Sequence, residues 1–176
     1  HDAALAGIAP NLLVANAVGL MIQACEATAG LVGNTLVSLG REPAAGTNVV
    51  AGIDIEARVA QVARLDPPVQ NTRRFMAADA VVCGQSLHAH DAVLVLLAAA
   101  AHDPAVDAAV DAASLQRPWT FGTGRHGCPG DALAQVLAAC TVQALLARDV
   151  RAARLADGVR YRPSVNARIP EFSPQP

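Results

Sequence analysis

The chain has 176 residues, a formal net charge of −2 and an apolar fraction of 53%, which suits one domain or part of a larger one. Its 13 basic residues other than histidine are all arginine and form no run, which argues against a nucleic-acid or anionic-membrane partner. With only 3% aromatic residues and abundant alanine, the composition favours closely packed helices over a large sheet.

The first predicted element is a long helix that begins near Pro10 and ends at Gly40, with no proline between them. It is apolar on nearly all faces, which predicts a central helix buried in protein. Glu26 is the only charged residue from Asn11 to Gly40, and a central carboxylate is costly in lipid, so a buried helix is favoured over a membrane span. Three glycines would let another group approach its backbone: Gly19, Gly30 and Gly33.

After this helix, the sequence predicts a loop, a second helix and several short strands. The stretch REPAAGTNVVAG has the composition of a loop. Apolar residues at helical spacing predict a helix from about Ile53 to Leu65, which the DPP triplet at 66–68 ends. From residue 69 to 98, extended stretches separated by Gly84 and Asp91 predict short strands.

The remainder is predicted to contain an irregular segment, a third helix and a hairpin. The stretch HDPAVDAAVDAASLQRPWT is irregular, and a helix is expected from about Gly130 to Arg148. In the tail, RAARLADGVRYRPSVNARIPEF, an Asp-Gly pair between two extended runs predicts a hairpin turn. The predicted fold class is therefore mainly α with small β elements.

The four cysteines match neither a zinc-binding spacing nor a CxxC redox pair. Cys25 and Cys140 lie inside apolar helical patterns, where a buried free thiol is expected. Nothing resembles a secretory signal, so a reducing cytoplasm is the expected location. Because the first residue is His and not Met, we expect a fragment or a processed chain.

Cys128 lies in the stretch FGTGRHGCPG, residues 121–130, in which four glycines surround one cysteine immediately before the third helix. A thiolate metal ligand must be held in one place and must receive hydrogen bonds from backbone N–H groups, which glycine leaves unobstructed. The N-terminus of the following helix also favours the negative charge of a thiolate. An ordinary turn cysteine is the alternative interpretation, and the density of the pattern disfavours it.

This stretch resembles the heme-ligand loop of the cytochrome P450 family, F-G-x-G-x-H-x-C-x-G. The resemblance implies that Cys128 is the axial thiolate ligand of heme b (iron protoporphyrin IX), with His126 near a propionate and Phe121 beside the porphyrin. It also implies that glycines in the loop let the backbone and the next helix approach the ring. The matching positions are Phe121, Gly122, Gly124, His126, Cys128 and Gly130.

The long first helix is similar to the distal helix of the same family, which carries A-G-x-[DE]-T. The corresponding stretch here is QACEAT, residues 23–28, which puts Glu26 on the acidic position and Ala27 where the family has threonine. The resemblance implies that Glu26 and Thr28 help to deliver protons to bound dioxygen, although Thr28 points about 100° further round the helix than a side chain at position 27. The alternative for Glu26 is a solvated or salt-bridged carboxylate.

The second helix resembles the family's E-x-x-R helix, with Gln61 in place of glutamate and Arg64 retained. An amide accepts a hydrogen bond from guanidinium but cannot form the charged bidentate pair, and Arg117 is the candidate third member of this network. Arg74 falls where the family has a propionate-binding arginine, with Arg73 as its close competitor.

The resemblance implies that residues 1–176 are the C-terminal heme-binding portion of a single P450 domain whose N-terminal half is absent. The implied activity is a monooxygenase that acts on a small organic substrate with O2 and with electrons from a redox partner, here a ferredoxin and its reductase. Because Ala27 weakens proton delivery to dioxygen, a peroxide-driven peroxygenase is one alternative. A degenerate, non-catalytic heme-binding relative or binding module is the other.

Overall fold

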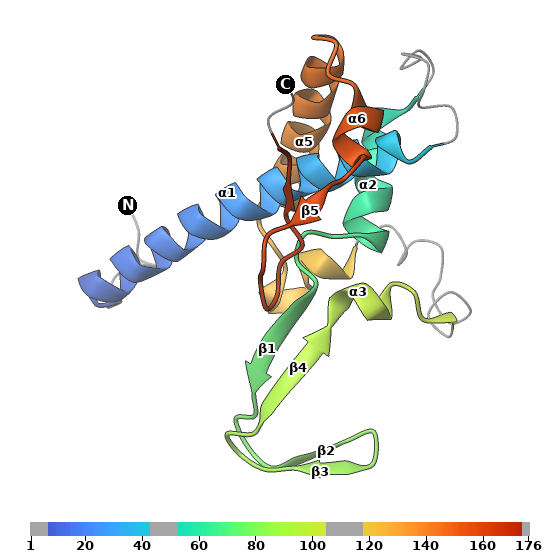
Figure 1. Ribbon diagram of the computed structural model, residues 1–176. Coiled ribbons are helices and arrows are strands. Elements are labelled where there is room, and N and C mark those ends of the chain that lie inside the picture. Colours follow the sequence, from blue (N-terminus) through green and yellow to red (C-terminus); the bar gives the residue numbers. More distant parts are fainter. Residues whose placement is uncertain (1–6, 43–52, 105–117, 174–176) are drawn as a thin grey trace.

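The computed structural model describes residues 7–42, 53–104 and 118–173 (Figure 1). It is mainly helical with small antiparallel sheets, so the predicted fold class is confirmed. The predicted loop after α1 lies mostly outside the described residues, as do Arg117 and most of the irregular segment. In chain order the elements are α1 (Pro10–Gly40), α2 (Ile55–Leu65), β1 (Asn71–Phe75), β2 (Ala80–Val82), β3 (Gln85–Leu87), β4 (Ala92–Leu96), α3 (Leu97–Ala100), η2 (Trp119–Phe121), η3 (Gly124–His126), α5 (Asp131–Leu146), α6 (Ala152–Ala156), β5 (Arg160–Tyr161) and β6 (Pro170–Glu171).

Helix α1 has the predicted bounds, but only its C-terminal third is a central helix. The segment from Gly30 to Leu39 is largely buried, whereas apolar side chains nearer the N-terminus, such as Met21 at 70% exposure, are open. The expectation that the whole helix is buried is therefore wrong for the described structure. The physical reason is visible in Figure 1, where α2, α5 and α6 surround one end of α1 and the other end projects beyond them.

Within the described residues, α1 is also the one helix that is long and apolar enough to cross a membrane. That property alone does not define a membrane segment, because core helices and signal sequences share it.

The core forms where α1, α2 and α5 meet. Leu31 and Leu36 of α1, Val59 of α2 and Val142 of α5 are at most 2% exposed. Ala138 of α5 is also fully buried, and its small side chain allows the helices to approach closely. The small alanine side chains therefore allow close helix packing at this contact.

Two of the three glycines that were predicted to be contact points on α1 are contact points. A Cβ at Gly30 would lie 2.6 Å from Cβ of Pro68, and one at Gly33 would collide with the ring of Pro170. Gly19 differs, because no described atom lies within 4 Å of a Cβ built there. The α1 backbone is thus approached by the segment after α2 and by strand β6.

Helix α2 begins two residues later than predicted, at Ile55, because the Asp54 side chain caps it by accepting a hydrogen bond from the Ala57 N–H at 3.0 Å.

The predicted strands are present, with β1 pairing antiparallel to β4. The middle stretch folds into a hairpin, β2–β3, because Cys83 and Gly84 adopt positive φ angles of 49° and 79° in a two-residue turn.

The predicted tail hairpin is present, but its turn was misplaced. Strands β5 and β6 pair antiparallel, whereas the Asp157–Gly158 pair lies before β5 and follows helix α6. Gly158 has φ +70°, the left-handed conformation that ends helices, and the Ala- and Arg-rich stretch before it has high helix propensity. The Asp-Gly pair therefore stops a helix and does not join two strands.

Candidate cofactor site

The Cys128 loop is closed by backbone hydrogen bonds across its base. The Cys128 N–H donates to the carbonyl of Phe121 at 2.7 Å, and the Gly122 N–H donates to Trp119 at 2.9 Å. Inside the loop, the Gly127 N–H donates to Gly124 at 3.0 Å. These bonds hold the half-buried Cys128 at a defined position directly before α5.

Glycine is required in this loop by its backbone geometry. Gly122 and Gly124 have φ angles of +65° and +55°, which L side chains rarely adopt. A Cβ at Gly122 would also lie 2.5 Å from the carbonyl oxygen of His126. At Gly124 and Gly130, by contrast, no described atom lies within 4 Å of a built Cβ, so the backbone there faces open space. The loop is tightly turned on one side and accessible on the other.

Both ends of the loop are anchored in the core. Phe121 packs against the buried cluster formed by α1, α2 and α5, and Thr120 donates to the carbonyl of Val69 at 3.2 Å. On the other side, α5 is anchored by Ala139 and Val142, which are buried. A thiol held between two anchored segments is suited to bind a ligand without reorganisation.

The donor set of the described residues fits a metal that brings most of its own ligands. In the described ranges, no group of three or more His, Cys, Asp or Glu side chains could hold a metal ion. A single half-buried thiol is therefore unsuited to a bare zinc ion, which takes four ligands. It would suit an iron porphyrin, which brings four nitrogen ligands of its own and can take one thiolate from the protein.

Glu26, predicted to serve in proton delivery, is held by an ion pair whose partner the sequence did not identify. Its Oε1 lies 2.9 Å from Nη2 of Arg162, which follows strand β5. Thr28, two residues further along α1, is half-buried. The described structure therefore agrees with the salt-bridged state that was the alternative for Glu26.

The predicted buried thiols are exposed. Cys25 and Cys140 are both free cysteines, but each faces outward in the described structure. The prediction of burial is wrong because only part of each helix surface is covered by the neighbouring elements, and neither cysteine lies on the covered part.

Arg74 and Arg73 lie on opposite faces of strand β1, because side chains alternate along a strand. The Arg74 Nη1 donates to Oγ1 of Thr72 at 2.6 Å and to the carbonyl of Arg73 at 3.0 Å. Both arginines are exposed. Arg74 is therefore bonded only within its own strand in these contacts and keeps donors available for an anionic group.

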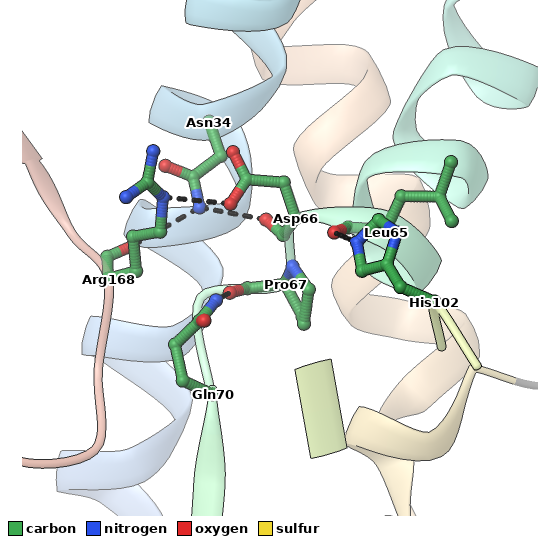
Figure 2. Close-up of polar contacts among 7 residues, drawn as sticks. All are labelled: Asn34, Leu65, Asp66, Pro67, Gln70, His102 and Arg168. Carbon is green, nitrogen blue, oxygen red and sulfur yellow. Dashed lines mark hydrogen bonds and ion pairs between the residues drawn. The ribbon is translucent and has the colours of Figure 1, made fainter. Parts of the chain in front are cut away.

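The α2–β1 junction is held by a polar network that the sequence reading missed (Figure 2). Buried Asn34 donates through Nδ2 to the carbonyls of Asp66 at 3.0 Å and Arg168 at 3.1 Å, and Arg168 Nε lies 2.8 Å from Oδ1 of Asp66. The guanidinium of Arg168 also covers the Tyr161 ring at 3.8 Å. The feature of the sequence that could have indicated this network is Asn34, an asparagine within an otherwise apolar helix.

The expected partnership between Gln61 and Arg64 does not form within the described part of the chain, where the two side chains share no hydrogen bond. The end of α2 is instead bonded by His102, whose Nε2 lies 2.8 Å from the carbonyl of Leu65 (Figure 2).

Known proteins with the same arrangement are cytochromes P450, although a scan against models of protein families gave no match. The chain is 31% identical over 161 residues to the biotin biosynthesis cytochrome P450 of Bacillus subtilis, covering 88% of this chain and 40% of that protein. It is 30% identical to the putative cytochrome P450 133B1 of Xylella fastidiosa, covering 77% of this chain and 35% of that protein.

Solved structures give the same result. A P450BioI structure, in complex with an acyl carrier protein carrying hexadec-9Z-enoic acid, matches with a TM-score of 0.67 and 31% identity, over 83% of this chain and 39% of that one. Ligand-free Mycobacterium smegmatis CYP164A2 matches with a TM-score of 0.69 and 26% identity, over 94% of this chain and 43% of that one.

The chain belongs to the cytochrome P450 family, whose cofactor is heme b. It spans 35% to 43% of the length of these four matched chains.

Proposed function

We propose that this chain is the heme-binding portion of a P450 monooxygenase that hydroxylates or otherwise oxygenates a small organic substrate. The overall reaction consumes O2, two electrons and two protons, transfers one oxygen atom to the substrate and releases the other as water. The observation that carries the proposal is the closed glycine loop, in which the Cys128 N–H is bonded to Phe121 directly before the anchored helix α5.

Cys128 is proposed to hold the heme iron, and Phe121 to pack beside the ring. When bound, the heme supplies oxygen activation, which thiolate ligation favours. Gly122 provides the tight turn, whereas Gly124 and Gly130 face open space that a ring edge could occupy. His126 and Arg74 are exposed donors suited to the two propionates.

Glu26 and Thr28 are proposed to supply protons to the oxygen-binding side. A carboxylate and a hydroxyl two residues apart on a helix point in different directions, so protons would pass between them through an intervening water. Ala27, between them in sequence, cannot contribute, because its side chain carries no hydroxyl.

We also propose that residues 1–176 form the C-terminal part of one P450 domain, completed by an N-terminal half. The share of the relatives covered supports this, as does the row of exposed apolar side chains on the N-terminal part of α1, which a second part of the domain would cover. A ferredoxin with its reductase is the proposed electron source, and a cytoplasmic location stays a prediction.

A peroxide-driven reaction is the second candidate, because Ala27 replaces the family's threonine. Turnover of the full-length protein with hydrogen peroxide should be compared with turnover with O2 and a ferredoxin system. Equal or faster O2-driven turnover would exclude the peroxide-driven reaction as the main activity.

The test of the leading proposal is the spectrum of the full-length protein containing this chain. Its reduced carbonyl complex should show the red-shifted Soret band of thiolate ligation, and Cys128→Ala should abolish that band even if heme is retained. Cys140→Ala is the matched control, because it removes an exposed thiol from α5 outside the loop. A folded, heme-containing protein without the band, or a band that survives Cys128→Ala, would refute the proposal.

A further inference from the structure

We infer that Arg162 is a positioning residue for Glu26, so that the C-terminal hairpin sets the orientation of the proton-delivering carboxylate. The inference rests on the proposed function. Its basis is the 2.9 Å contact between Glu26 Oε1 and Arg162 Nη2, which joins α1 to the segment after β5.

Arg162 is carried by a segment that cannot easily move relative to α1. The Arg162 N–H donates to the carbonyl of Ile169 at 3.0 Å, which fixes it across the hairpin. The hairpin is bonded in turn to the segment after α2, because the Arg168 N–H donates to Pro68 at 2.7 Å. Asn34 of α1 donates to the carbonyl of the same Arg168. The guanidinium is therefore presented from a backbone that is tied to α1 itself.

Glu26 lies on the face of α1 that the hairpin covers. Residues four and seven positions further along a helix share a face with the first, which places Glu26 in line with Gly30 and Gly33. At both glycines the hairpin lies close to the α1 backbone, because a Cβ at Gly30 would lie 3.3 Å from Cγ1 of Ile169 and one at Gly33 would collide with the ring of Pro170. A side chain on this face one turn earlier necessarily extends toward the hairpin, where Arg162 meets it.

The ion pair is suited to orient Glu26 more than to stabilise the fold. The Glu26 side chain is 54% exposed and that of Arg162 is 42% exposed in the described chain. Pairs with this exposure contribute little to stability and are screened by salt. Holding a carboxylate in one orientation can nevertheless change a proton-transfer rate strongly, because small displacements of a catalytic group are costly.

The experiment uses the full-length protein with heme bound and compares Glu26→Gln, Arg162→Gln, the double variant and Arg162→Lys. The first readout is coupling, the fraction of consumed electrons recovered in product and not in hydrogen peroxide. The second is the thermal midpoint of unfolding, at low and high salt. Arg160→Gln is the matched control, because it removes a positive charge two residues earlier in the chain, and the ion pair of Glu26 in the described residues is with Arg162.

Arg162→Gln is expected to lower coupling by roughly 3- to 10-fold. It should have no further effect in the Glu26→Gln background, because Arg162 acts through Glu26. Arg162→Lys should restore part of the coupling, and Arg160→Gln should leave it unchanged. In thermal unfolding, the midpoint shift of the double variant should differ from the sum of the two single shifts by about 1–3 °C at low salt. This difference should become smaller at high salt.

Coupling that is unchanged in Arg162→Gln, while Glu26→Gln lowers it, would overturn the role of Arg162 and leave the proposed function intact. A further loss in the double variant beyond Glu26→Gln would also overturn it, because Arg162 would then act independently. Absence of the red-shifted carbonyl band in the wild-type protein would instead refute the proposed function itself.

Discussion

Gly33→Ala tests the close packing of the C-terminal hairpin on α1. In an open helix this change stabilises by about 1 kcal/mol, because alanine has the higher helix propensity. Here the new methyl group would meet the ring of Pro170, with Cδ at 3.1 Å and Cγ nearer still. A proline ring cannot rotate away, so the hairpin backbone must shift.

The two effects have opposite signs, and their sizes decide the outcome. Overpacking a well-packed contact costs about 1–3 kcal/mol, which exceeds the propensity gain over most of that range. Because the rigid ring cannot yield, we expect the upper half of that cost and therefore a net destabilisation of about 1–2 kcal/mol, or a fall of about 2–8 °C in the thermal midpoint. Gly33 and its contacts all lie within the described residues, so the estimate does not depend on other parts of a longer protein.

Pro170→Ala provides the internal control, because it removes the ring carbons that the new methyl group would meet. Phe172, whose Cε2 lies at 3.6 Å, is already at ordinary contact distance. The free energy of unfolding lost in the double variant Gly33→Ala/Pro170→Ala should therefore be smaller, by about 1 kcal/mol or more, than the sum of the losses in the two single variants. Thermal unfolding followed by circular dichroism measures all four proteins. A stabilising Gly33→Ala, or strict additivity in the cycle, would refute the packing argument.

Two further substitutions test the polar contacts around α2. Asn34→Leu should lower stability by about 2–4 kcal/mol, since the carbonyls of Asp66 and Arg168 each lose a buried donor; a thermal midpoint equal to wild type would contradict this. Asp54→Ala should lower stability by about 1 kcal/mol, because α2 loses its cap. Asp54→Ser should keep most of the wild-type stability, because serine can also cap a helix. Equal midpoints for Asp54→Ala and Asp54→Ser would show that the cap is not the cause.

Local chemistry was sufficient to predict much of the fold. The long helix from Pro10 to Gly40 follows from an unbroken apolar pattern between a proline and a glycine, and the structure has the same bounds. The Cys128 loop follows from glycines at positions where only glycine fits, such as Gly122 with its φ of +65°. Such signals are readable because each depends on residues close together in sequence.

One error arose from an ambiguous local signal, and another arose because distant segments decide burial. The Asp-Gly pair before β5 is compatible with a strand turn or a helix stop, and α6 decides between them. The burial of Cys25 and Cys140 could not be derived from apolar periodicity, because the pattern shows that a helix has an apolar surface and not which part is covered.

The sequence by itself determined the class of the fold, the glycine-lined cysteine loop and the resemblance to P450s, because backbone conformation and short motifs are local properties. Only the tertiary structure decided that Glu26 meets Arg162, that Asn34 joins α1 to the end of α2, and that just one end of α1 enters the core. These contacts join residues far apart in the chain, and they exist only where packing brings their elements together.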